Sequence, residues 1–250
     1  MYRYGLGSYD LYLYKFLAMK QIVIAFFALV LLASCNRITG SGNIVTEKRS
    51  VGNFKGVSVS NGLDVEVKQG STMEVLVEAD DNVIPYIETT VSGGVLKIRT
   101  EGLNNLRNVH MKVYVTAPVL NSLRASSGAT IDVDGDIRSD EKMDFHASSA
   151  ADINAAIIAP SVDADASSGS TINLNGKTRD LLVESSSGSN VKCGNLLSEN
   201  CKASASSGSE AEVHASVKLN AAASSGSSIS YRGGANVSKA ESSGGSVSKN

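Results

Sequence analysis

Hydrophobic and polar residues alternate one by one along most of the chain beyond residue 44. Between Val162 and Leu174, every second residue is small or apolar, and the residues between them are mostly Asp, Asn, Ser or Thr. A period of two residues is typical of β-strands that bury one face and expose the other. The pattern therefore predicts an all-β protein.

A short serine-rich motif interrupts this alternation at a regular interval. Ser-Ser-Gly, or once Ser-Ser-Ala, occurs seven times, and the second serines follow one another after 22, 19, 19, 20, 18 and 18 residues. A fixed period near 20 residues is the signature of a solenoid, in which each unit buries its apolar face by stacking on its neighbours. We expect residues 119–250 to form a parallel β-helix or β-solenoid of about seven rungs of about 19 residues.

The parity of the alternation places the second serine of each motif on the inner side. Stacked inward serines could satisfy one another's hydroxyls along the axis of the solenoid, which removes the cost of burying them singly. In the seventh unit the same phase would turn Lys239 and Glu241 inward, so we interpret that unit as a polar end cap. The expected inward serine ladder comprises Ser127, Ser149, Ser168, Ser187, Ser207 and Ser225.

Residues 44–118 carry strand-like runs without the serine period, and they form the expected N-terminal β-rich segment. Asn61-Gly62 joins two alternating runs, which indicates a hairpin or a tight turn. The inward parity of residues 109–117 continues into Leu123. We therefore expect this segment to abut the solenoid and close its first rung without a flexible linker.

The first 43 residues have the layout of a secretion signal and tether. Met19-Lys20 opens a basic segment, and Ile22–Leu32 is apolar but too short to span a bilayer permanently. Leu-Ala-Ser-Cys then resembles a bacterial lipobox, which implies cleavage before Cys35 and lipidation of that cysteine; an ordinary signal with a chance cysteine is the alternative. We expect residues 1–34 to be a misassigned start plus a lipoprotein signal peptide, and residues 35–43 to be the lipidated cysteine and its tether.

Cys193 and Cys201 both fall on inward positions of the predicted rungs. Small buried hydrophobes are one interpretation. A disulfide is the other, since an oxidising compartment allows it.

The segment "GSGNIVTEKRSVGNFKGVSVSNGLDVEVKQG" from Gly40 to Gly70, followed by Ser-Ser-Gly units, resembles the bacterial family called putative auto-transporter adhesin, head GIN domain. The likeness covers nearly all of the chain after the signal. It implies a secreted or lipid-anchored β-solenoid protein of the cell envelope. It supplies no catalytic or ligand-binding residues to carry over.

The sequence offers little support for catalysis, a metal or a cofactor. No Gly-x-Ser-x-Gly motif occurs, and the Ser189-x-x-Lys192 spacing places the serine inside and the lysine outside. His110, His146 and His214 are scattered, without a second metal ligand at a useful spacing. The net charge of −2, with no basic patch among aromatics, argues against nucleic acid as a partner.

Outward positions of successive rungs should stack into polar columns, which form the candidate binding face. A ladder of Asn, Asp and Thr can bind glycan hydroxyls or a cation, although a solvated polar face is the plainer interpretation. Acid–base chemistry would need Glu210 with Glu212, or Asp132 with Asp152, and these columns hold no aromatic platform for a sugar. The candidate face comprises Thr130, Asp132, Asp152, Asn154, Thr171, Asn173 and Asn190.

These observations favour a non-enzymatic, lipid-anchored adhesin or binding module that presents a polar solenoid face to a glycan or to another envelope protein. The alternatives are a carbohydrate-active β-helix enzyme and a purely structural envelope protein that stacks end to end through its last rung. We expect an outer-membrane location. The residues after Cys35 lack an acidic cluster, which favours the periplasmic face over the cell surface.

Overall fold

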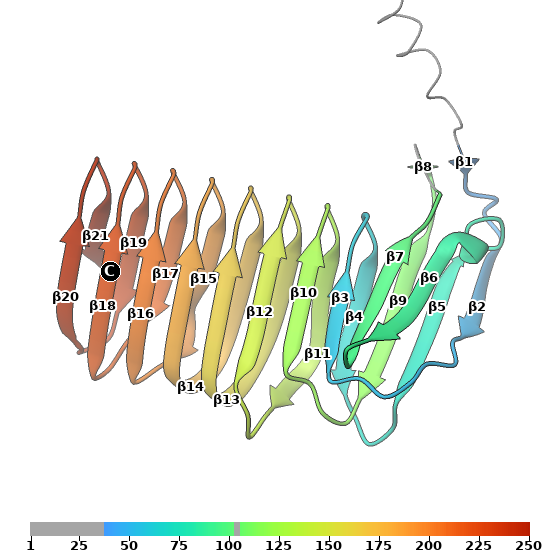
Figure 1. Cartoon of the computed structure of the whole chain (residues 1–250), viewed down its shortest axis with the longest axis horizontal. Helices are drawn as coiled ribbons and strands as arrows, with labels where there is room; N and C mark the ends of the chain where they lie inside the picture. The colour runs from blue at the N-terminus through green and yellow to red at the C-terminus, as the bar shows by residue number, and fades with distance from the viewer. Residues whose placement is uncertain (1–37, 103–105) are drawn as a thin grey trace, which may run out of the picture. The chain divides into compact units, whose positions relative to one another are not determined.

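The computed structural model describes residues 38–102 and 106–250, so the expected signal peptide and Cys35 lie outside the described residues (Figure 1). Two compact units are distinguished. The described part of the smaller unit is a parallel pair formed by β1 (Ile38–Thr39) and β8 (Leu106–Arg107). The larger unit comprises residues 40–102 and 108–250. Nowhere in the described residues is there a helix with the length and apolar character needed to cross a membrane.

The repeats form the predicted parallel β-solenoid, and each rung contributes one strand to each of two sheets (Figure 1). We call the strands that lead into the serine motifs sheet 1 and those that follow the motifs sheet 2. Among residues 119–250, all of which are described, the strand pairs form seven rungs joined by six full turns, as the period predicts. Sheet 1 contains β10 (Ser122–Ser126), β12 (Met143–Ser148), the second halves of β13 (Asp152–Ala166) and β14 (Thr171–Ser185), β16 (Asn200–Ala205), β18 (Lys218–Ala223) and β20 (Asn236–Glu241). Sheet 2 contains β11 (Thr130–Arg138), the first halves of β13 and β14, β15 (Asn190–Leu197), β17 (Glu210–His214), β19 (Ser228–Arg232) and β21 (Ser246–Lys249).

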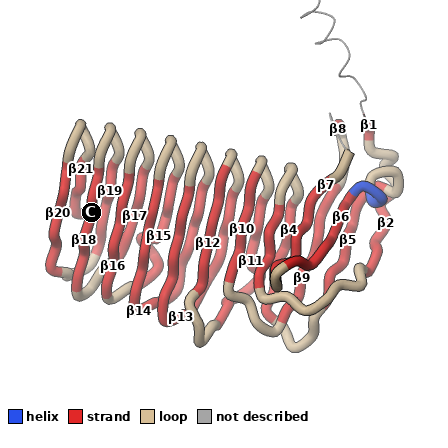
Figure 2. The backbone as a smooth tube through the Cα atoms, viewed as in Figure 1, coloured by secondary structure: helices blue, strands red, loops and turns tan. Residues whose placement is uncertain are grey.

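The serine motifs are the turns between the two sheets, and they line up along one edge of the solenoid (Figure 2). In the first motif Ser127 has φ 54° and Gly128 has φ 71°, and the Ala129 N–H donates to the carbonyl of Ser126 at 3.3 Å. Two left-handed residues closed by such a bond make a type I′ turn. Each turn is also bonded to the next one, because the Gly128 N–H donates to the carbonyl of Ser149 at 3.0 Å.

The expected inward serine ladder is therefore wrong. The second serines are exposed at the tips of the turns, because two successive left-handed residues reverse the chain and suspend the period-two alternation. Ala125 before the first turn and Ala129 after it are buried, as the alternation predicts, but the alternation does not continue through the turn between them. The correction applies to Ser127, Ser149, Ser168, Ser187, Ser207 and Ser225.

A buried serine ladder does exist, two residues further on. Its hydroxyls bond to the backbone rather than to one another: Ser170 Oγ donates to the Ala147 carbonyl of the preceding rung at 2.8 Å and accepts the Ser167 N–H at 3.1 Å. These serines fasten each turn to its neighbour, and the cost of burying a hydroxyl is offset by two hydrogen bonds. The ladder comprises Ser170, Ser189, Ser209 and Ser227; the first two rungs have Ala129 and Ala151 there instead.

The interior is narrow beside the turns and wider toward the middle of the rungs. Ala125, Ala147, Ala166, Ser185, Ala205 and Ala223 follow one another in one inward column of sheet 1. An apolar wall stands opposite in sheet 2, with Ile131, Ile153, Ile172, Val191, Ala211 and Ile229 in register and buried. Small side chains thus line the corner where the sheets converge.

At the start of the larger unit, β3 (Gly56–Val59) and β4 (Asp64–Gln69) form a further rung. Asn61-Gly62 is its turn, with φ 65° and 69°, and the Gly62 N–H donates to the Ser127 carbonyl at 3.0 Å. The tight turn expected here is present, but the two strands do not form a hairpin. Each pairs in parallel with strands of the neighbouring rungs.

The N-terminal end of the solenoid, which we call the head, comprises β2 to β7 and β9. The order of these strands in space differs from their order in the sequence. The rung made by β7 (Val95–Thr100) and β9 (Met111–Ala117) lies outside β3 and β4, although it comes later in sequence. Antiparallel strands then cover it: β6 (Ile87–Ser92) on β7, and β5 (Glu74–Asp80) followed by β2 (Ile44–Lys48) on β9. A 3-10 turn, η1 (Ile84–Tyr86), connects β5 to β6. Strand pairing is continuous from this head into the repeats.

The segment Gly40–Asn43 is fastened to the end of β5. The buried Asp80 carboxylate accepts the Gly42 N–H at 2.6 Å and the His110 N–H at 2.7 Å. A side chain on Gly40 would collide with the same carboxylate. Hydrogen bonds from Ser41 and then Asn43 hold the pKa of Asp81 below its usual value. The Gly-Ser-Gly-Asn stretch is thus a fixed part of the head.

The last rung carries the polar end cap expected from the sequence. Lys239 and Glu241 stand in register with the inward Ala221 and Ala223 of the preceding rung. Lys239 Nζ donates to the Val247 carbonyl at 2.6 Å, and Glu241 Oε1 accepts the Val247 N–H at 2.6 Å. Inward-pointing charges at an edge strand discourage the addition of another strand.

We predict that two glycines at left-handed positions differ sharply in their tolerance of a side chain. A Cβ on Gly176 would lie 2.0 Å from the Ile157 carbonyl oxygen, whereas a Cβ on Gly188 would meet nothing within 4 Å. Gly188→Ala should lower the free energy of unfolding by about 1–2 kcal/mol, because alanine is strained at a left-handed φ. Gly176→Ala should lower it by at least about 3 kcal/mol, because the backbone clash adds to the strain. Urea unfolding followed by circular dichroism measures both, and equal losses would contradict the geometry.

The exposed second serine of a motif and the buried serine after its glycine should respond differently to substitution. Ser170→Ala removes two buried hydrogen bonds and should lower the free energy of unfolding by about 1–2 kcal/mol. Ser168→Asn should leave it unchanged or slightly raised, since asparagine adopts left-handed angles more readily than serine. Thermal unfolding of the two variants provides the comparison, and a larger loss for Ser168→Asn would restore the inward assignment.

Candidate functional site

The register of sheet 2 stacks the predicted candidate residues into two outward columns, which we call the polar columns. The first runs through Thr130, Asp152, Thr171 and Asn190, and the second through Asp132, Asn154 and Asn173. Asn154 Nδ2 donates to Asp132 Oδ1 at 2.8 Å, so two side chains of neighbouring rungs are linked directly. The side chains of the second column are exposed, and three of the first column are half-buried.

The polar columns continue into the C-terminal rungs with a change of charge. Asn190 is followed by Glu210, and Asn173 is followed by Lys192 and Glu212. Ser189 is buried, whereas Lys192 is exposed, so the Ser-x-x-Lys spacing does not bring a serine and a lysine together. Within residues 38–102 and 106–250 no group of three or more His, Cys, Asp or Glu side chains is placed to hold a metal ion.

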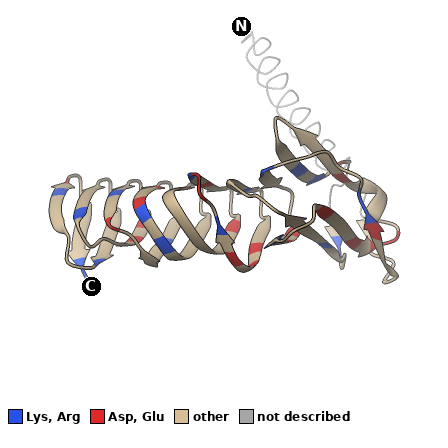
Figure 3. Cartoon of the chain, turned by 90° about the horizontal axis from the view of Figure 1, so that it is seen from below, with Lys and Arg blue, Asp and Glu red and all other residues tan. Residues whose placement is uncertain are grey.

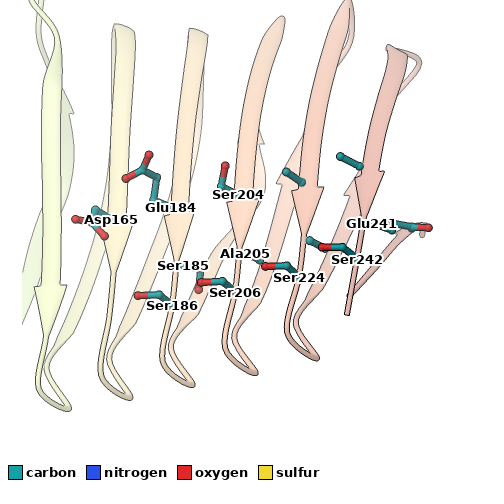
Figure 4. A pocket seen from close by; sticks show the side chains of 13 residues that line it. Asp165, Glu184, Ser185, Ser186, Ser204, Ala205, Ser206, Ser224, Glu241 and Ser242 are labelled. Carbon is teal, nitrogen blue, oxygen red and sulfur yellow. The ribbon is translucent and has the colours of Figure 1, made fainter. Parts of the chain in front are cut away.

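A hollow of about 500 Å³ lies on sheet 1, away from the predicted face (Figure 4). Its floor is formed where one outward column consists of Ser204, Ala222 and Ala240 on successive rungs, and short side chains leave a trough between taller neighbours. Asp165 and Glu184 stand at one end of it. The first serines of four motifs, Ser186, Ser206, Ser224 and Ser242, also line it.

Sequence reasoning missed this trough, although a signal for it existed. Read rung by rung, the same column runs Arg124, His146, Asp165, Glu184, Ser204, Ala222 and Ala240, from charged to small. Each of these residues lies three positions before the second serine of a motif, so the repeat period alone gives their order.

A second hollow of about 330 Å³ adjoins the first and is bordered by charged groups that are already paired. His146 Nδ1 lies 3.1 Å from Asp165 Oδ2. Lys142 Nζ contacts both Asp144 at 2.8 Å and Asp163 at 2.6 Å, and these carboxylates raise the pKa of the lysine. Acidic and basic residues are interspersed along the solenoid (Figure 3).

The two inward cysteines are free thiols. Cys193 on β15 and Cys201 on β16 are buried, and no disulfide joins them in the structure. Burial raises the pKa of the Cys201 thiol to about 12, and it raises the pKa of Cys193 still further. Both therefore act as small apolar side chains of the interior, and the disulfide interpretation is wrong for this structure.

Another hollow, of about 460 Å³, lies at the head, where Arg49, Tyr86, Glu88, Thr89 and Glu101 form its walls. No part of the serine repeat contributes to it. The sequence pattern had drawn attention to none of these residues.

Comparisons with known proteins confirm the family resemblance and the fold. The model of the family described as putative auto-transporter adhesin, head GIN domain, matches residues 53–235. A search of curated proteins gives no match.

Solved structures share the architecture at low sequence identity. A putative adhesin of Bacteroides fragilis has a TM-score of 0.78 and 18% identity, over 85% of this chain and 98% of that one. A putative lipid binding protein of Parabacteroides distasonis has a TM-score of 0.71 and 19% identity, over 86% and 100% of the two chains. A putative adhesin of Parabacteroides merdae has a TM-score of 0.65 and 17% identity, over 86% and 100%. At such identities the likeness establishes the fold alone.

Proposed function

Since this chain belongs to the family described as putative auto-transporter adhesin, head GIN domain, we propose that it is a non-enzymatic binding protein of the cell envelope. A lipid on Cys35 anchors it to the outer membrane, and the polar columns of sheet 2 bind its partner. The partner is a glycan or another envelope protein. The single observation that carries the proposal is the unbroken stacking of the candidate side chains on one outward sheet face.

The polar columns suit recognition because they are rigid and regularly spaced. Neighbouring rungs lie about 4.8 Å apart, so a repetitive partner meets the same kind of group at each step. Amide side chains such as Asn154 and Asn173 both donate and accept hydrogen bonds. Because the groups stand on paired strands, little ordering entropy is lost on binding.

The arrangement supports binding over hydrolysis. Glycoside cleavage needs two carboxylates facing each other across a bound sugar. The Asp132 carboxylate instead accepts a hydrogen bond from Asn154 on an exposed sheet. The three hollows described above are lined by residues other than Asp132, Asp152, Glu210 and Glu212.

End-to-end stacking receives no such support. The last rung closes its interior with Lys239 and Glu241, both bonded to the backbone of Val247. A further rung added there would have to cover these charges, which disfavours a structural polymer.

Replacing the side chains of the second column should weaken partner binding without unfolding the protein. We predict that the triple variant Asp132→Ala, Asn154→Ala, Asn173→Ala loses at least about tenfold in affinity for isolated cell envelopes. The matched control is Ser122→Ala, Asn220→Ala, Ser238→Ala, three outward positions of sheet 1. Sedimentation of detergent-solubilised full chain with envelopes measures binding. If the column variant binds as well as the control does, sheet 2 is not the binding face.

The lipid anchor generates a separate prediction. Cys35→Ser should move the protein from the outer-membrane fraction to the soluble fraction, since a single processed cysteine carries the acyl chains. The unsubstituted protein should resist protease added to intact cells, as expected of the periplasmic face. Fractionation and immunoblotting test both points. Degradation in intact cells would place the protein on the cell surface, and membrane retention of Cys35→Ser would contradict the anchor.

A further inference from the structure

The hollow at the head differs in chemistry from the polar columns and from the trough on sheet 1. It lies where the chain leaves β2 at Arg49, where η1 ends at Tyr86, and where β7 ends before Glu101. Its volume of about 460 Å³ falls within the range of small-ligand sites. Three segments distant in sequence thus converge on one concave surface.

An exposed aromatic ring stands in the wall of this hollow. The described residues contain five Phe and Tyr side chains: Phe54, Phe145 and Tyr231 are buried, Tyr114 is half-buried, and Tyr86 is 41% exposed. The backbone of Tyr86 is fixed, because the Tyr86 N–H donates to the Val83 carbonyl at 2.9 Å and the Tyr86 carbonyl accepts the Glu101 N–H at 2.9 Å. A ring held in this way offers an apolar face and a polar tip at little entropic cost.

A guanidinium with unused donors lies in the same wall. Arg49 Nη2 donates to the Ile84 carbonyl at 3.1 Å and lies 3.2 Å from Glu47 Oε2. Both contacts fall on this one nitrogen, and within the described residues the buried Nε has no hydrogen-bond partner. An unsatisfied buried donor is rare in folded proteins. A ligand hydroxyl entering the hollow, with a small shift of the guanidinium, would supply the missing acceptor.

The carboxylates of the hollow restrict the charge of the ligand. Glu88 is paired with Arg99 at 2.7 Å, whereas Glu101 is exposed and has no ion-pair partner in the described part of the chain. When the ion-pair partners Glu47 and Arg99 are counted with the lining residues, three carboxylates stand against two guanidinium groups. The remaining negative charge disfavours uronic acids and phosphates.

From this geometry we propose that the hollow binds a neutral saccharide unit. The C–H face of the sugar ring packs on Tyr86, its hydroxyls donate to Glu101, and a hydroxyl oxygen accepts from Arg49. This site is separate from the polar columns, so it adds a second contact to the proposed function and does not depend on which residues of sheet 2 bind.

Saturation-transfer NMR and calorimetry of the full chain in detergent test the site. The probes are cellobiose and N,N′-diacetylchitobiose as neutral sugars and glucuronic acid as the anionic one. At least one neutral disaccharide should bind, and glucuronic acid should bind more weakly. Absence of binding by both neutral sugars, or a preference for glucuronic acid, would overturn the proposal.

Four variants identify the binding residues. Tyr86→Ala should weaken binding at least about tenfold, and Tyr86→Phe should retain it within about twofold, because the ring face is kept. Arg49→Lys keeps the charge but loses Nε and should weaken binding severalfold. Val217→Ala, at another exposed apolar side chain, is the matched control and should change nothing.

Thermal unfolding of each variant separates loss of the site from loss of the fold. Unchanged binding by a folded Tyr86→Ala would overturn the proposal. If the second-column triple variant loses envelope binding but keeps the disaccharide, and Tyr86→Ala does the opposite, the two sites are independent. Loss of the disaccharide by the folded triple variant would place the sugar on the polar columns and overturn the proposal.

Discussion

The hydrogen bond from one turn to the next governs the geometry of this protein. In each of the first six serine motifs, the residue after the left-handed serine points its N–H at the carbonyl of the corresponding serine one rung further on, as Gly128 does toward Ser149 and Gly169 toward Ser187. Both residues of each turn adopt positive φ, as a type I′ turn requires. The turns therefore stack without drift, and the strands that leave them are held in register. The inward alanine column, the apolar wall and the polar columns all follow from that register.

The serine after the glycine adds further hydrogen bonds between one rung and the next. Buried hydroxyls such as Ser189 Oγ bond to the carbonyl of the preceding rung and accept an N–H within their own turn. A larger side chain would not fit where the two sheets converge, and an alanine would leave these bonds unmade. The repeated Ser-Ser-Gly-Ser sequence thus combines an exposed serine held in a left-handed conformation with a buried serine whose hydroxyl bonds to the backbone.

Much of the solenoid could be predicted from sequence because a regular repeat specifies its own register. The period placed Thr130, Asp152 and Thr171 above one another, and the structure confirms that stacking. The serine assignment failed because alternation describes extended backbone and loses its meaning across two left-handed residues. The hollow at the head was beyond sequence reasoning for another reason. Arg49, Tyr86 and Glu101 belong to no repeat, and only strand order brings them together.

The placement of β3 and β4 between strands that follow them in sequence affects how the molecule is assembled. This rung has β7 and β9 on one side and β10 and β11 on the other, so a chain emerging from its N-terminus gives it no complete neighbouring rung until β9 ends at Ala117. Thereafter each serine unit adds to a finished edge by contacts with its immediate predecessor. Loss of the last rung would therefore shorten the solenoid, whereas damage to the head would remove the edge on which β10 and β11 stack.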